Sequence, residues 1–387
     1  MKKFKPGIEV FFSSDFPGKF RVAAVTNHTG RTRNGDHLVN LLANHESFEL
    51  VRIFTPEHGF TSDAPDGEHV ADSKHEELAV PVISLYGPNK KPAKELISDI
   101  DALIYDIQDV GVRFYTYIST LRNIIDAAAE SEVAVWILDR PDVLGGFSVE
   151  GPMLQEGFSS FVSHLPVPIR YGLTPGELAL WWKNKNSLNV EIKIWKCADY
   201  CCYHKSEFPD FPWFQPSPSM PDVKTALFYP GTCLFEGTQV SEGRGSDAPF
   251  RNIGAPWIDA RRWLDFIKPL LPAEIKVVES RFVPAFSKYE GYECSGIRFD
   301  TDLPYVDNAV YIGVAAIYSL MQTHPGKVRF EGRPGLEKPF LDYLCGTDEI
   351  RKGLLNNEEP HEIIQKCKAG VEEFAKERKR FFLYPRN

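Results

Sequence analysis

No apolar stretch of this sequence is long enough to span a bilayer, so no membrane span is expected. The chain begins with MKKFKPGIEVFFSSDF, which has a basic start but lacks the sustained apolar segment and cleavage site of a signal peptide. We therefore expect a cytoplasmic protein. The alternative is a periplasmic or secreted protein from which the signal has been removed.

Basic residues are too few for a nucleic-acid-binding protein. Lysine and arginine number 44 against 53 aspartates and glutamates, and the net charge is -9 at pH 7. Nucleic-acid binders usually carry a basic face, so no nucleic-acid partner is expected. A negative total does not exclude a small anionic substrate, because local charge can differ from the total.

Cysteine spacing gives no sign of a disulfide framework or a zinc cluster. The seven cysteines are an odd number, and no C-x-x-C pair occurs. Nucleotide and esterase motifs are missing too: there is no G-x-G-x-x-G after the first predicted strand, no G-x-x-x-x-G-K-[ST] and no G-x-S-x-G. We therefore expect reduced thiols and no cofactor.

Strand-like and helix-like segments alternate through the first part of the chain. Apolar runs at 20–26, 50–54, 101–106, 133–138 and 190–195 predict buried strands, and helical spacing marks 35–45 and 116–130. This rhythm predicts an α/β fold with a Rossmann-like, doubly wound, mostly parallel sheet. A capping box in LTPGEL indicates a helix beginning after Thr174, with Glu177 in a structural role.

The second part of the sequence indicates a smaller α+β domain. Five prolines between 208 and 221 predict an extended connector. Beyond it, 260–271 and 308–322 read as helices and 275–282 as a strand, and 362–380 reads as a terminal helix with a solvated basic end. We expect an N-terminal catalytic domain at 1–227 and a C-terminal domain at 228–387 that closes the active-site cleft.

Polar pairs follow four of the predicted strands. They are Asn27-His28, Glu57-His58, Gln108-Asp109 and Asp139-Arg140. Open parallel sheets bind ligands outside the carboxyl ends of their strands, so these pairs are expected to converge on a site. The alternative is that loops after strands are polar in any protein.

Carboxylates are the most informative of the candidate catalytic residues. Glycoside hydrolysis uses one carboxylic acid to protonate the leaving oxygen and often a second carboxylate as nucleophile or base. Glu57 is the candidate acid, assisted by His58, and Asp109 is the preferred second carboxylate because it lies within its loop. Asp106, Asp139 and Glu242 are further candidates, although Asp139 could instead cap a helix or pair with Arg140.

A divalent metal is the competing interpretation of the same region. Oxygen and imidazole ligands are dense at Glu57, His58, Asp63, Asp66, Glu68 and His69. There is no H-E-x-x-H motif or regular ligand spacing, so no metal is expected. A metal-dependent hydrolase stays as the alternative.

Eight motifs, in order, resemble the NamZ-type exo-β-N-acetylmuramidase family, once catalogued as a domain of unknown function. They are FTPEHGF, DIQDVGVRFYTYISTL, LDRPDVLGG, VEGPML, PIRYGLTPGELA, PSPSMP, YPGTCLFEGTQVSEGRG and GAPW. The resemblance covers roughly residues 7 to 385. It implies a glycosidase of peptidoglycan recycling with a site in the cleft between two domains, and it matches the family's proposed catalytic glutamate to Glu57. The missing signal segment departs from the family and puts export in doubt.

The resemblance also implies a saccharide substrate, terminal β-linked N-acetylmuramic acid released from the non-reducing end of peptidoglycan fragments. The lactyl carboxylate of this sugar calls for a cation, and Arg113, Arg170 and Arg244 are the candidates, although each could make a structural ion pair instead. Tyr115 could pack on the sugar. The remaining expected substrate contacts are Asn27, His28, Asp139, Arg140 and Glu242. A non-catalytic protein that binds cell-wall fragments is the third hypothesis, and the oligomeric state is left open.

Overall fold

The computed structural model describes residues 4–61, 71–75, 77–202 and 210–386. Within them, the N-terminal half is built on a seven-stranded sheet with the order β3-β4-β2-β1-β5-β6-β9, parallel except between β3 and β4. The strands are β1 (Phe20–Thr26), β2 (Phe48–Thr55), β3 (Ser73–Lys74), β4 (Pro81–Ser84), β5 (Ala102–Asp106), β6 (Ala134–Leu138) and β9 (Ile192–Trp195). The six parallel strands follow the 3-2-1-4-5-6 order of the Rossmann fold, which confirms the predicted fold class.

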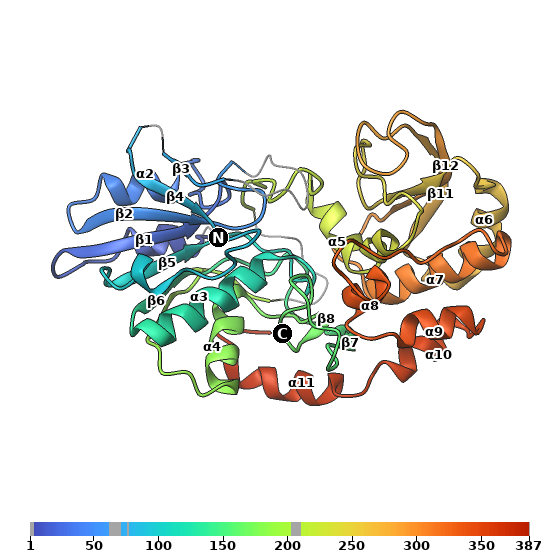
Figure 1. The fold of residues 1–387 in the computed structure, drawn as a ribbon. Helices are drawn as coiled ribbons and strands as arrows, with labels where there is room; N and C mark the ends of the chain where they lie inside the picture. Colours follow the sequence, from blue (N-terminus) through green and yellow to red (C-terminus); the bar gives the residue numbers. More distant parts are fainter. Residues whose placement is uncertain (1–3, 62–70, 76, 203–209, 387) are drawn as a thin grey trace.

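The inner parts of the central strands are apolar, and helices cover both faces of the sheet. Val22 and Ala24 pack toward α1 (Gly7–Phe11) and α2 (Leu38–Ala43), whereas Ala23 and Val25 pack into the core of the opposite face. That second face is covered by α3 (Tyr117–Ser131) and α4 (Pro175–Lys185), which Figure 1 places below the sheet. Parallel strands buried on both sides read as continuous apolar runs rather than alternating ones.

Helix α4 begins as the sequence predicts. The Thr174 hydroxyl accepts a hydrogen bond from the Glu177 amide, and the Glu177 carboxylate accepts one from the Thr174 amide at 3.0 Å. Both groups are fully buried. The capping box and the structural role of Glu177 are therefore confirmed.

The C-terminal half carries a small antiparallel sheet with helices on one side (Figure 1). Its strands are β10 (Asn252–Ala255), β11 (Lys276–Phe282) and β12 (Cys294–Asp300), in the order β10-β12-β11. Its helices are α5 (Val223–Thr232), η2 (Cys233–Gly237), α6 (Ala260–Ile267), η3 (Lys268–Leu270), α7 (Ala309–Thr323), α8 (Phe340–Cys345), α9 (Glu349–Leu355), α10 (Pro360–Lys366), α11 (Val371–Glu377) and η4 (Arg378–Phe381). In the N-terminal half, η1 (Lys94–Leu96) and the hairpin β7 (Glu150–Met153) and β8 (Pro168–Arg170) complete the described elements.

The predicted boundary after residue 227 falls inside α5. This helix approaches α7 closely at Gly231 and Gly313, where an added Cβ would lie about 2 Å from backbone of the facing helix. Residues 223–227 therefore belong to a helix that packs with the C-terminal half, and the exact division of the chain stays a prediction.

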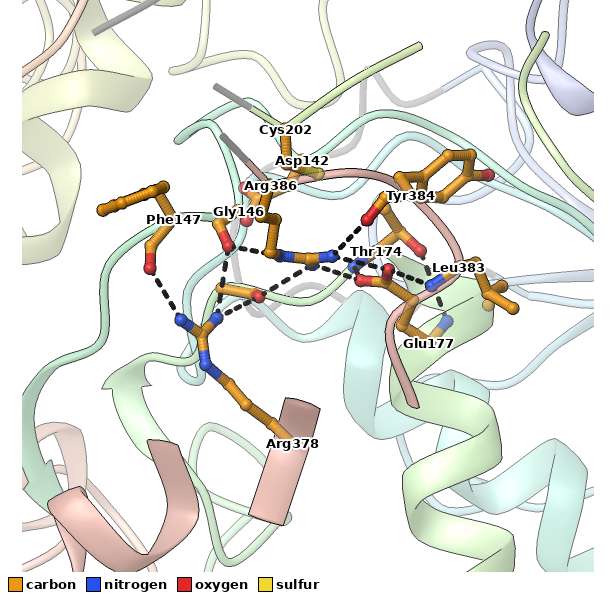
Figure 2. Close-up of polar contacts among 12 residues, drawn as sticks. Asp142, Gly146, Phe147, Thr174, Glu177, Cys202, Arg378, Leu383, Tyr384 and Arg386 are labelled. Atoms are coloured by element: carbon orange, nitrogen blue, oxygen red, sulfur yellow. Dashed lines mark hydrogen bonds and ion pairs between the residues drawn. The ribbon is translucent and has the colours of Figure 1, made fainter. Parts of the chain in front are cut away.

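The last segment differs from the predicted single helix. Gly370, with φ of 76°, separates α10 from α11, and the chain then turns back onto the N-terminal half. Arg378 is buried and donates hydrogen bonds to the carbonyls of Gly146 and Phe147 (Figure 2). The prediction of a solvated basic end is wrong for Arg378, because these carbonyls lie more than 200 positions earlier in the sequence and no local pattern reveals them.

Across the described ranges, none of the helices has the length and apolar character needed to cross a membrane.

Candidate functional site

The carboxyl ends of the central strands meet at one edge of the sheet. Thr26 at the end of β1 pairs with Asp106 at the end of β5, and Val25 pairs with Phe54 of β2. The loops that follow these strands, and the loop after β6, therefore leave the sheet on the same side. The sequence predicted this convergence from the parallel rhythm alone.

Glu57 lies in a tight turn directly after β2. The Gly59 amide donates to the Pro56 carbonyl at 3.1 Å, and both His58 and Gly59 adopt left-handed backbone conformations, with φ of 71° and 75°. Glycine tolerates this region, but a histidine there costs backbone energy. Such strain is found at functional sites more often than elsewhere, and here it fixes the direction in which Glu57 leaves the strand.

Glu57 and His58 line a pocket between the two halves of the chain. Its N-terminal wall also includes Tyr115 and Thr116, which precede α3. Its C-terminal wall includes Tyr229, Glu236, Arg244, Phe250, Arg333 and Phe340. The predicted residues Glu57, His58, Tyr115 and Arg244 thus come together in one pocket, although they are up to 187 positions apart in the sequence.

The Thr116 hydroxyl orients the carboxylate of Glu57. It donates a hydrogen bond to Glu57 Oε2 at 2.6 Å, and both side chains are buried. Tyr115 packs edge-on against Tyr117 and Tyr229, so one aromatic edge links the two walls. Sequence reasoning missed Thr116, although its place immediately before the helix in DIQDVGVRFYT was a usable signal.

The C-terminal wall carries an interlocked set of charges, which we call the arginine cluster: Glu236, Glu242, Arg244, Lys288 and Arg333. Glu236 accepts from Arg244 and from Arg333, each at 2.7 Å, and Glu242 pairs with Lys288 at 3.0 Å and Arg244 at 3.4 Å. Burial alone would raise the pKa of Glu236, but Arg244, Arg333 and Lys288 together hold it well below its usual value. Glu236 is therefore an anion at neutral pH.

Asp109 does not line the pocket. Its Oδ2 accepts from the Gly111 amide at 2.8 Å and from the Tyr171 hydroxyl, and the carboxyl is buried. Burial raises the pKa of Asp109 to about 7, against the opposing effect of the Tyr171 hydrogen bond. These contacts engage Asp109 outside the pocket lining and do not favour its predicted role as a second catalytic carboxylate.

Asp139 and Arg140 have structural partners. Asp139 accepts from Thr174 Oγ1, the Gly176 amide and the Tyr384 hydroxyl, and burial raises its pKa to about 6. Arg140 binds both oxygens of Asp106, at 2.5 and 2.7 Å, with both side chains buried. These contacts favour the helix-cap alternative for Asp139, and Arg140 has its ion-pair partner in Asp106.

Two of the three arginines predicted for the lactyl carboxylate are engaged elsewhere. Arg113 is completely buried and donates to the carbonyls of Pro152, Val167 and Leu344. Arg170 is buried too, and it pairs with Glu150 at 2.6 Å and donates to two main-chain carbonyls. Neither lines the pocket, so the geometry does not favour either as a substrate ligand.

The loop after β1 also lies outside the pocket lining. Asn27 is buried and donates to the Tyr117 hydroxyl at 3.0 Å, while its Oδ1 accepts from the Thr29 amide and hydroxyl. The carbonyl of His28 accepts from Arg31 at 2.8 Å. Glu242 is also outside the pocket lining, and it pairs with Arg244 and Lys288 within the arginine cluster. These three predicted contacts support the walls and stay predictions as substrate ligands.

The alternative metal cluster can be compared with the structure only in part. Asp63, Asp66, Glu68 and His69 lie outside the described residues. Among the residues that the structure does describe, no group of three or more acidic, histidine or cysteine side chains is arranged to hold a metal ion.

Comparisons with known proteins agree on one family for the whole chain. The family model described as exo-beta-N-acetylmuramidase NamZ, N-terminal, matches residues 22–224, and its C-terminal counterpart matches residues 227–384. The peptidoglycan beta-N-acetylmuramidase NamZ of Bacillus subtilis (strain 168) is 34% identical over 388 residues, covering 99% of this chain and 92% of that protein.

Two solved structures from Bacteroides fragilis NCTC 9343, both of DUF1343 family proteins, share the fold. One superposes with a TM-score of 0.88 at 28% identity and covers 99% of each chain. The other has a TM-score of 0.76 at 30% identity and covers 100% of each chain. With both family models matched in order and a full-length relative at 34% identity, the chain belongs to the exo-β-N-acetylmuramidase NamZ family.

Proposed function

We propose that this protein is a glycoside hydrolase that releases terminal β-linked N-acetylmuramic acid from the non-reducing end of peptidoglycan fragments, with Glu57 as the general acid. The observation that carries the proposal is the pocket itself: an oriented glutamate on one wall faces arginines on the other. The family and the Bacillus subtilis relative supply the reaction class.

Glu57 has the surroundings that a general acid needs. Its carboxyl sits in a pocket wall with little exposure, and the Thr116 hydroxyl donates a hydrogen bond to its Oε2. Proton donation to a leaving oxygen requires a heavy-atom approach of about 3 Å, which a fixed side chain at the end of a strand can hold. His58 follows in the same turn and is proposed to assist Glu57.

The group that attacks or shields the anomeric carbon is not Asp109 in this proposal. Asp109 Oδ2 is held by Tyr171 and Gly111 beneath the sheet edge, away from the pocket lining. Glu236 lies on the facing wall, where Arg244 and Arg333 pair with it and hold it as an anion.

Release of a chromophore tests the proposal directly. The wild-type protein should cleave a β-linked N-acetylmuramic acid conjugate and should cleave the N-acetylglucosamine conjugate much more slowly, since only the first bears the lactyl carboxylate. Equal rates on the two conjugates would contradict the specificity. Binding of peptidoglycan fragments without any product after long incubation would point instead to a binding protein.

A further inference from the structure

The arginine cluster has one cation more than it has carboxylates. Arg244, Lys288 and Arg333 face Glu236 and Glu242. Arg244 contacts both carboxylates, and Lys288 contacts Glu242 and the carbonyls of Phe235 and Val240. One positive charge of the cluster is therefore not neutralised by a carboxylate. It is expected at the cation whose ion pairing is weakest, where a bound anion would balance it.

Arg333 is the cation of this cluster with the fewest polar contacts. Among the described residues, its ion pair is with a single oxygen, Oε2 of Glu236. Its side chain is 49% exposed, against 25% for Lys288 and 11% for Arg244. A guanidinium carries five donors, so Arg333 retains several that can reach a ligand.

The Phe340 ring holds the Arg333 guanidinium in place without accepting hydrogen bonds from its N–H groups. The central carbon of the guanidinium lies 3.5 Å from the centroid of the Phe340 ring. A cation over the face of an aromatic ring is attracted to it, and the N–H groups around the edge stay available for a planar, bidentate partner. The Glu236 contact fixes the rotation of the group about this stack.

We infer that Arg333 binds the lactyl carboxylate of the terminal N-acetylmuramic acid and so determines specificity for this sugar over N-acetylglucosamine. The inference rests on the proposed function, because it assigns the sugar's carboxylate to one wall of the pocket and its glycosidic bond to Glu57 on the other. A carboxylate is the anion that fits a guanidinium edge with two parallel hydrogen bonds.

Arg244 lines the same pocket but fits this role less well. Glu236 and Glu242 both contact its guanidinium, and its central carbon packs over Phe250 at 4.8 Å. Its function in the cluster is to keep Glu236 ionised and in position, so that Glu236 in turn orients Arg333. Glu236 is thus the positioning residue and Arg333 the contact.

The test compares two substrates and two variants. The substrates are a chromogenic β-linked N-acetylmuramic acid conjugate and its lactyl methyl ester, which removes the charge and adds one methyl group. Wild-type kcat/KM should favour the acid by about ten- to a hundredfold, the effect of a hydrogen bond to a charged group. In Arg333→Gln this preference should collapse toward one, mainly through a higher KM for the acid.

Arg329→Gln is the matched control, because Arg329 lies on the same loop, is 73% exposed and reaches Glu331 only at 4.0 Å. It should keep the wild-type preference. An unchanged acid-to-ester ratio in Arg333→Gln would overturn the inference while leaving the proposed function intact. Absence of cleavage of either conjugate by the wild-type protein would instead overturn the proposed function. A urea unfolding curve for each variant separates loss of recognition from loss of folding.

Discussion

Glu57→Gln is expected to lower kcat at least a hundredfold on a natural disaccharide, with a much smaller change in KM. The amide keeps the size of the side chain and can still accept from Thr116, but it cannot donate a proton to the leaving sugar oxygen. General acids contribute about 10²- to 10⁴-fold to such reactions. Steady-state kinetics on a disaccharide with N-acetylmuramic acid at its non-reducing end measures the effect.

The leaving group makes this experiment specific for an acid. A nitrophenolate needs little protonation to depart, so Glu57→Gln should lose much less activity on a nitrophenyl conjugate than on the disaccharide. Glu49→Gln is the control, because Glu49 lies on β2, the strand that precedes Glu57, is exposed and pairs with Arg21 at the surface. Equal losses on the two substrates would argue that Glu57 binds the sugar without protonating the leaving oxygen.

Arg386→Ala is expected to destabilise the folded protein by about 3–5 kcal/mol. Arg386 binds both oxygens of Glu177, at 2.5 and 2.9 Å, and also donates to the Gly146 carbonyl at 2.9 Å (Figure 2). Glu177 is completely buried, and its carboxylate also accepts from the Leu383 amide. Removal of the arginine would leave a buried charge without its counter-ion, which is the costly way to break such a pair.

The free energy of unfolding in urea measures this loss. Arg380→Ala is the matched control, since Arg380 belongs to the same terminal segment but is exposed, and its loss should cost about 0.5 kcal/mol or less. If the two variants unfolded at a similar urea concentration, the terminal segment would not stabilise the N-terminal half through Arg386.

The parallel sheet was predictable because its determinants are local. The stretches 22–25, 102–105 and 133–138 are apolar without interruption, which is what a strand covered on both faces requires, and helical spacing follows the first two at 35–45 and 116–130. The docking of the terminal segment was not predictable. It depends on carbonyls at 146–147 and 171–172 that present no side-chain signal in the sequence.

The site shows the same division between local and distant determinants. Glu57, His58 and Tyr115 could be found because polar or aromatic residues after strands stand out in the sequence. The sequence could not show which arginine binds the substrate carboxylate. Arg113, for example, looks like a substrate-binding residue until its main-chain carbonyl partners are known. Arg333 carried no recognisable motif, since its relation to Glu236 joins positions that are 97 residues apart.

The most direct measurement is a crystal structure of the Glu57→Gln protein with a disaccharide that carries β-linked N-acetylmuramic acid at its non-reducing end. The account predicts that the sugar occupies the pocket between the two halves of the chain. The substituted side chain should then lie about 3 Å from the glycosidic oxygen, with the lactyl carboxylate on Arg333. A sugar bound with its glycosidic oxygen out of reach of residue 57 would contradict the central claim.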